Sequence, residues 1–133
     1  MTTEQLAAQL EIAYHADAAV RTASGEGITS AEQMAVNAYL TPLSRRIARA
    51  GVRRSRESRR GGRLQTRDYV SAVARDAEKD IRDDPACGSM IAVVGWIVLE
   101  KLLWNLAFRL AQWLVMSDDR EDLIYKMETT ECR

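Results

Sequence analysis

The chain has 133 residues, of which 47% are hydrophobic and 29% are charged, and its formal net charge is zero. This composition is typical of a folded protein with one core, and it argues against a disordered chain or two ordinary domains. The two cysteines, Cys87 and Cys132, match no metal-binding spacing and have only His15 as a companion, so we expect no metal site and no cofactor.

Helix-forming residues dominate the chain, and strand-type alternation is scarce. The first helix is predicted over Thr3–Ala23. Thr2 or Thr3 is suited to cap its start, and Gly25 and Gly27 are suited to end it.

A second helix is predicted to begin at Thr29 or Ser30, where Ser30 and Gln33 resemble a capping box. Pro42 follows Thr41 and is expected to interrupt this helix. Because proline is tolerated at the first position of a helix, we predict a new helix from residue 42 to about residue 60. A single kinked helix is the alternative.

The remaining helices are predicted from glycine breaks and caps. Gly61 and Gly62 end the third helix, and a connecting helix runs over 66–83. One long apolar helix is expected from Met90 to Met116, and Ser117 begins a last short helix. The sequence therefore predicts an all-α fold, a helical bundle or extended helical arrangement of about five helices. They form a single domain over 1–133, made of the units 1–62, 66–83 and 89–128.

The positive charge of the chain is concentrated between residues 43 and 67, a stretch that contains ten arginines and only one acid, Glu57. Five of them fall within about 80° on a helix and form a ridge about 22 Å long. This arginine ridge consists of Arg45, Arg49, Arg53, Arg56 and Arg60. A continuous guanidinium face repels itself unless anions lie against it.

Three partners fit such a ridge: the phosphate backbone of nucleic acid, acidic segments of this or neighbouring copies such as 76–84 and 118–122, and an anionic membrane surface. No aromatic residue lies between 43 and 67, so stacking on single-stranded bases has no support there.

The apolar helix has one narrow polar row, made of Lys101, Asn105, Arg109 and Gln112. The other helices are rich in Ala or Arg and offer little large apolar surface to cover it. We therefore expect neighbouring copies or another protein to complete its burial. The residues predicted at this oligomer or partner interface are Trp96, Leu99, Leu103, Trp104, Leu106, Leu110, Trp113 and Leu114.

A membrane span is the rival interpretation of the same helix, since it is long enough to cross a bilayer. Glu100, Lys101 and Arg109 near its middle would each be costly there, and the acidic flanks give no orientation signal.

No catalytic arrangement is visible, because neither His15 nor Cys87 has a chemical partner nearby in sequence. We therefore expect a non-enzymatic structural component of a multi-copy or multi-protein assembly, virion-like or nucleoprotein. It would pack by its apolar helix and present its arginines to nucleic acid or acidic neighbours. A membrane-associated subunit and a free-standing DNA-binding protein are the alternatives. Met1–Leu10 shows no secretion signal, so we expect a cytoplasmic or virion-like location.

Overall fold

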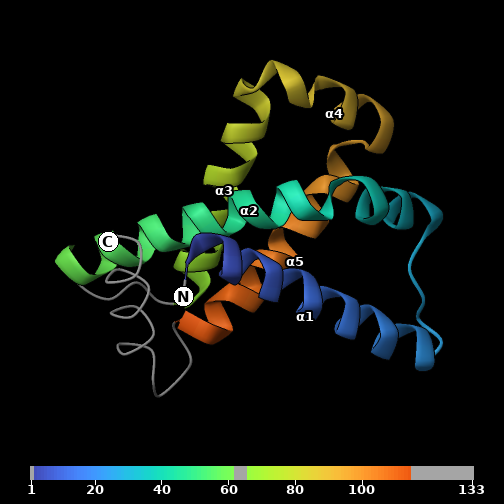
Figure 1. Ribbon diagram of the computed structural model, residues 1–133, viewed down its shortest axis with the longest axis horizontal. Helices are drawn as coiled ribbons and strands as arrows, with labels where there is room; N and C mark the ends of the chain where they lie inside the picture. Colours follow the sequence, from blue (N-terminus) through green and yellow to red (C-terminus); the bar gives the residue numbers. More distant parts are fainter. Residues whose placement is uncertain (1, 62–65, 115–133) are drawn as a thin grey trace.

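The computed structural model describes residues 2–61 and 66–114, and these residues form five α-helices and no strand. The prediction of an all-α fold of about five helices is confirmed (Figure 1). The helices are α1 (Thr3–Ala23), α2 (Ser30–Gly61), α3 (Thr66–Asp83), α4 (Gly88–Val94) and α5 (Trp96–Leu114), with a 3₁₀ turn at Pro85–Cys87.

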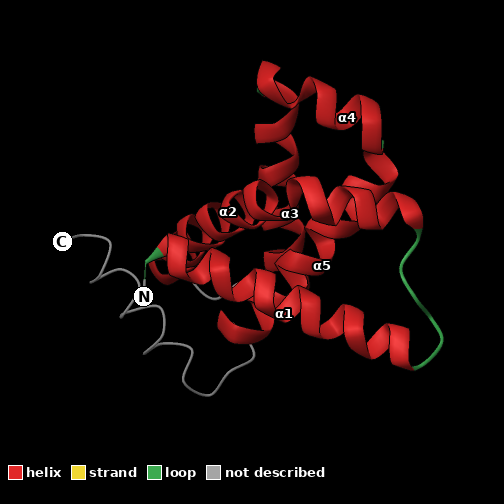
Figure 2. Cartoon of the chain, turned by 45° about the vertical axis from the view of Figure 1, so that its right-hand side comes forward, coloured by secondary structure: helices red, strands yellow, loops and turns green. Residues whose placement is uncertain are grey.

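Helix α1 begins and ends as predicted. The Thr2 side chain accepts a hydrogen bond from the Gln5 backbone N–H at 3.1 Å, and the Thr2 backbone N–H donates to Gln5 Oε1 at 2.8 Å. This reciprocal capping box satisfies two backbone N–H groups that a helix start otherwise leaves without partners. Gly25 then turns the chain away with a φ of 85°, a region that glycine adopts without strain. The loop that follows leads to α2 (Figure 2).

The predicted break at Pro42 is wrong, and the alternative of one helix through this point is correct, because α2 is one helix of 32 residues with Pro42 inside it. Proline lacks the N–H that would bond to the preceding turn. However, Leu40 and Leu43 on either side of it are 3% and 0% exposed, so packing holds both halves of the helix to the same core. At its start, the Thr29 side chain accepts from the Glu32 backbone N–H at 3.1 Å.

The prediction of one helix over Met90–Met116 is also wrong. The chain turns at Gly95, and the segments Pro85–Val94 and Trp96–Leu114 are bent by 105° relative to each other. Gly95 ends α4 with φ 84° and ψ 153°, a conformation essentially restricted to glycine. The part of the predicted helix beyond Leu114, and the predicted last helix to 128, lie outside the described residues.

Helix α2 lies at the centre of the fold and contacts α1, α3 and α5, while α3 and α5 also pack on each other. Figure 1 shows α1 running alongside α2, with α5 crossing behind both and α3 and α4 forming an arch above. The buried apolar residues of all these helices form one connected core. Arg45, Arg49 and Arg53 of the arginine ridge lie on the side of α2 that is left outside this core.

Candidate functional site

The arginine ridge is exposed over its first half. Arg45 and Arg49 are exposed, and within the described part of the chain neither forms an ion pair. The Arg53 side chain is 53% exposed and lies 3.6 Å from an oxygen of Asp76. Arg56 is partly buried and makes contacts of its own, and the side chain of Arg60 lies outside the described residues. Arg45 and Arg49 are therefore exposed arginines of the ridge that have no ion pair with any described residue.

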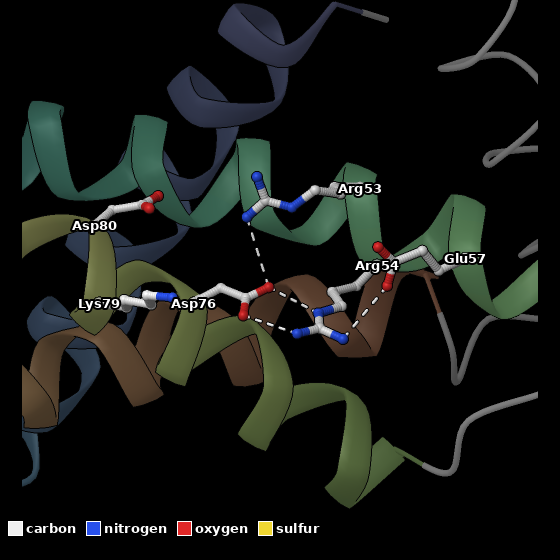
Figure 3. Close-up of a pocket in the computed structure, with 6 residues that line it drawn as sticks. All are labelled: Arg53, Arg54, Glu57, Asp76, Lys79 and Asp80. Carbon is white, nitrogen blue, oxygen red and sulfur yellow. Dashed lines mark hydrogen bonds and ion pairs between the residues drawn. The ribbon is translucent and has the colours of Figure 1, made fainter.

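The neighbouring arginine Arg54 points the other way, toward α3. Its Nε and one terminal nitrogen donate to the two carboxylate oxygens of Asp76, at 2.7 and 2.8 Å, and its other terminal nitrogen donates to Glu57 at 3.3 Å (Figure 3). This paired geometry is the strong form of an arginine–carboxylate contact. It holds the pKa of Asp76 below its usual value, mainly through the hydrogen bonds from Arg54.

Arg46 makes a second ion pair on this side of α2. A terminal nitrogen of Arg46 donates to Asp84 at 2.9 Å and to the Cys87 sulfur at 3.2 Å. Asp84 also accepts from the Ala86 backbone N–H at 3.0 Å. That backbone bond, followed by the one from Arg46, lowers the pKa of Asp84, whereas burial raises the pKa of the Cys87 thiol. Two acids of the 76–84 segment are thus taken by Arg46 and Arg54, while the predicted acidic segment 118–122 lies outside the described residues.

A small groove of about 240 Å³ opens between α2 and α3 beside Arg53. Three basic and three acidic side chains line it, and Figure 3 shows the Arg54–Asp76 pair at its centre. Sites for organic ligands are mostly apolar with a few polar groups, so this charged groove has the character of an ion-pair network. The lining residues are Arg53, Arg54, Glu57, Asp76, Lys79 and Asp80.

The leucines predicted to meet a partner need correction, because this chain buries them itself. Each of these five leucines of α5 is at most 1% exposed and belongs to the core that α5 shares with α2 and α3: Leu99, Leu103, Leu106, Leu110 and Leu114. Of the predicted tryptophans, Trp96 and Trp113 are partly buried and Trp104 is 38% exposed. The sequence reasoning missed Ile97 and Phe108, which are 84% and 50% exposed on the same helix.

The polar row of α5 divides between solvent and a contact with α1. Lys101 is exposed, whereas Asn105 and Gln112 are partly buried. Arg109 forms an ion pair with Asp17 of α1. This contact joins residues 92 positions apart, so no local pattern in the sequence could have indicated it.

A buried ionisable cluster between α1 and α2 was also missed. The Tyr14 hydroxyl donates to Glu32 Oε1 at 2.7 Å, and Arg21 lies 3.4 Å from the same oxygen. Glu32 is only 3% exposed, and its second oxygen has no hydrogen-bond partner among the described residues. Burial, and then the bond to Glu32, raises the pKa of Tyr14 to about 12. The cluster therefore ties the start of α2 to α1.

Among the described residues, no group of three or more His, Cys, Asp or Glu side chains could hold a metal ion. In that part of the chain no single helix meets the length and apolarity needed to cross a membrane, and only the bent pair on either side of Gly95 does so jointly. No protein-family model, curated protein or solved structure matches the chain.

Proposed function

We propose that the protein is a non-enzymatic component of a multi-copy nucleoprotein assembly, and that the arginine ridge of α2 binds the phosphate backbone of nucleic acid. One observation carries this proposal. Arg46 and Arg54 are paired with acids of α3 and the turn after it, whereas Arg45 and Arg49, each within one or a few positions of them, are exposed and unpaired in the described part of the chain.

The spacing of the ridge suits a polyanion. Residues four apart on one helix face are separated by about 6 Å along the helix axis, so successive guanidinium groups repel each other in the absence of anions. A nucleic-acid backbone offers a row of phosphates and releases its condensed counterions when arginines replace them. Since no aromatic residue interleaves the ridge, the contact is to phosphate and carries little base preference.

The number of available charges argues for many copies. In the described part of the ridge, two exposed arginines without an ion pair and the half-exposed Arg53 neutralise few phosphates, so this part of one copy contributes only weak binding with a shallow dependence on salt. Linked copies along one polymer raise the overall affinity without new contacts. An assembly is therefore the context in which this ridge is effective.

The test compares two matched pairs of substitutions. Arg45→Gln with Arg49→Gln removes the unpaired charges, while Arg46→Gln with Arg54→Gln removes the internally paired ones; each pair removes two charges from the same helix and keeps helix propensity. Affinity for a labelled 30-base-pair DNA and a matching RNA is measured at about 50 and 200 mM salt, and the stability of each variant by thermal melting.

The first pair is expected to weaken binding and to reduce the slope of log affinity against log salt by somewhat under one unit per arginine, with no change in melting temperature. The second pair is expected to lower the melting temperature and to leave the salt slope unchanged. Equal losses of binding in the two pairs would contradict the proposal, as would no binding by the parent protein at about 50 mM salt. Binding to anionic vesicles in place of DNA and RNA would favour the membrane alternative.

A further inference from the structure

Helix α5 carries a row of large apolar side chains on its outer face. Ile97, Trp104 and Phe108 are 84%, 38% and 50% exposed, and they fall within about 40° of one another around the helix. We call these three residues the exposed stripe. Single exposed apolar residues are ordinary on protein surfaces, but several on one helix face, two of them aromatic, are typical of an interaction surface.

The spacing of the stripe matches that of paired helices. Ile97, Trp104 and Phe108 follow one another at intervals of seven and four, which are spacings found along the seam between two helices in a coiled coil. Lys101 is exposed and lies at the edge of this seam, between the levels of Ile97 and Trp104. The geometry therefore favours another helix as the occupant of the stripe.

Two residues of opposite charge flank the stripe, one on each side. Glu100 and Lys101 are both exposed. Around the helix, Glu100 lies about 60° to one side of the line through the three apolar residues, and Lys101 lies about 40° to the other side. If two copies of α5 pair in parallel around a two-fold axis along the helices, the glutamate flank of each copy meets the lysine flank of the other. An antiparallel two-fold pair instead places like flank against like flank, which is unfavourable.

We propose that α5 pairs in parallel with α5 of a second copy. In this pair Ile97, Trp104 and Phe108 meet their counterparts, and each Glu100 faces Lys101 of the partner subunit. This inference rests on the multi-copy part of the proposed function and does not require that the arginine ridge binds nucleic acid. The interface is isologous, since the same surface is used by both copies.

An acidic contact beside the stripe supports this arrangement. The carboxyl group of Glu100 lies beside that of Glu78 of α3, and one oxygen of Glu78 is buried with no hydrogen-bond partner among the described residues. Burial, and then the neighbouring Glu100 carboxyl, raises the pKa of Glu78, even though Arg82 and Arg75 of α3 lower it. Lys101 of the partner subunit would bring a further positive charge to this pair of acids.

The first test is a charge exchange, measured without nucleic acid by sedimentation equilibrium from about 1 to 100 µM. In a two-fold pair each substitution occurs in both copies, so Lys101→Glu and Glu100→Lys each create two pairs of like charges across the interface. Each is expected to raise the dimer dissociation constant about tenfold. The double variant restores opposite charges and is expected to return the constant to near the parent value. A double variant as weak as the single ones would overturn the parallel arrangement.

The second test fixes the direction of the pair by cross-linking. In a protein with Cys87→Ala and Cys132→Ser, cysteine is introduced at 97, 104 or 108, one position at a time. A parallel two-fold pair brings each position next to its own counterpart, so all three variants are expected to form disulfide-linked dimers under mild oxidation. Lys79→Cys, exposed on α3, is the control that should remain uncoupled.

Three results would overturn the pairing. The first is a parent protein that remains a monomer at 100 µM, and the second is cross-linking at only one of the three positions, as an antiparallel pair allows. A monomer that sediments with lipid vesicles through the stripe also overturns it, because a lipid surface is then the occupant. A monomeric protein that still binds DNA would contradict the pairing of α5 but not the proposed binding of nucleic acid. A dimer that does not bind nucleic acid would contradict the proposed function but not the pairing.

Discussion

Gly51 of α2 lies directly against Leu110 of α5, and we predict that Gly51→Ala destabilises the protein. A Cβ atom at this position would lie 2.1 Å from Leu110 Cδ2 and 3.0 Å from the Tyr69 hydroxyl. The Gly51 carbonyl also accepts hydrogen bonds from Tyr69 and Ser55, both at 2.8 Å. One position of α2 thus holds contacts to both α3 and α5.

The magnitude follows from two opposing effects. Alanine is better than glycine inside a helix by up to about 1 kcal/mol. Overpacking of a filled core typically costs about 1–3 kcal/mol, and Leu110 is fully buried, so its methyl group has no open space to enter. A shift of the Tyr69 hydroxyl would weaken a buried hydrogen bond that contributes about 1 kcal/mol. We expect a net loss of about 1–2 kcal/mol of unfolding free energy.

The assay is urea unfolding followed by circular dichroism at equilibrium. Gly88→Ala is the matched control, because a Cβ at Gly88 meets no atom within 4 Å and its φ of −59° is helical. This control should be neutral or slightly stabilising. Leu110→Ala alone should cost about 2–5 kcal/mol, and its combination with Gly51→Ala should cost less than the sum of the two, since the smaller side chain makes room. A Gly51→Ala protein as stable as the parent would refute the reasoning.

Three further substitutions test other contacts. Gly95→Ala forces a side chain into a conformation that glycine alone tolerates, so it should cost about 1–3 kcal/mol or straighten the bend, as seen in melting temperature and helical signal. Glu78→Gln should raise the melting temperature at pH 7, because a carboxyl whose pKa is raised on folding destabilises the folded state when ionised; the gain should vanish below about pH 4, where Glu78 is protonated in both states. A constant gain across this range would contradict that origin. Tyr14→Phe removes a donor from the buried Glu32 carboxylate and should cost about 1.5–3 kcal/mol, and an unchanged unfolding midpoint would be evidence against the bond.

Helix starts and ends that depend on neighbouring residues were predictable from the sequence. Thr2 and Gln5 form their capping box within one turn, and Gly25 ends the same helix where its conformation is needed. These contacts involve residues at most a few positions apart, so the residue types alone specify them. The pairing of α2 with acids of the 76–84 segment was among the predicted alternatives, but not which arginines take part.

Pro42 and Gly95 were misjudged for the same reason. In the sequence proline is the stronger helix breaker, yet α2 continues through Pro42 and the apolar segment breaks at Gly95. The core decides both outcomes: Leu40 and Leu43 are buried on both sides of the proline, whereas the turn at Gly95 lets α5 cross against α2 and α3. Such tertiary contacts override local propensity.

The expectation that the leucines of α5 require a partner failed because it gave alanine too little weight. Small side chains let helix backbones approach closely, so a few alanines and a glycine can cover a leucine face that would otherwise need large residues. Gly51 beside Leu110 is the clearest example. Five alanines of α2 and α3 are completely buried in the core: Ala35, Ala48, Ala50, Ala74 and Ala77.

The arginine ridge and the exposed stripe lie on opposite sides of the contact between α2 and α5. Around α5, Leu110 is about 140° from the centre of the stripe, and around α2, Gly51 is about 160° from the centre of the ridge. Because Gly51 and Leu110 meet, the two surfaces face away from each other.

A dimer formed through the stripe would carry its two ridges on its outer faces. One short duplex cannot then reach both ridges, so loss of dimerisation should leave the salt slope of DNA binding unchanged. It should abolish the bridging of separate DNA molecules, which is measured as light scattering of long DNA. A fall of the slope by half in Lys101→Glu would show that both ridges contact one duplex and would contradict this placement.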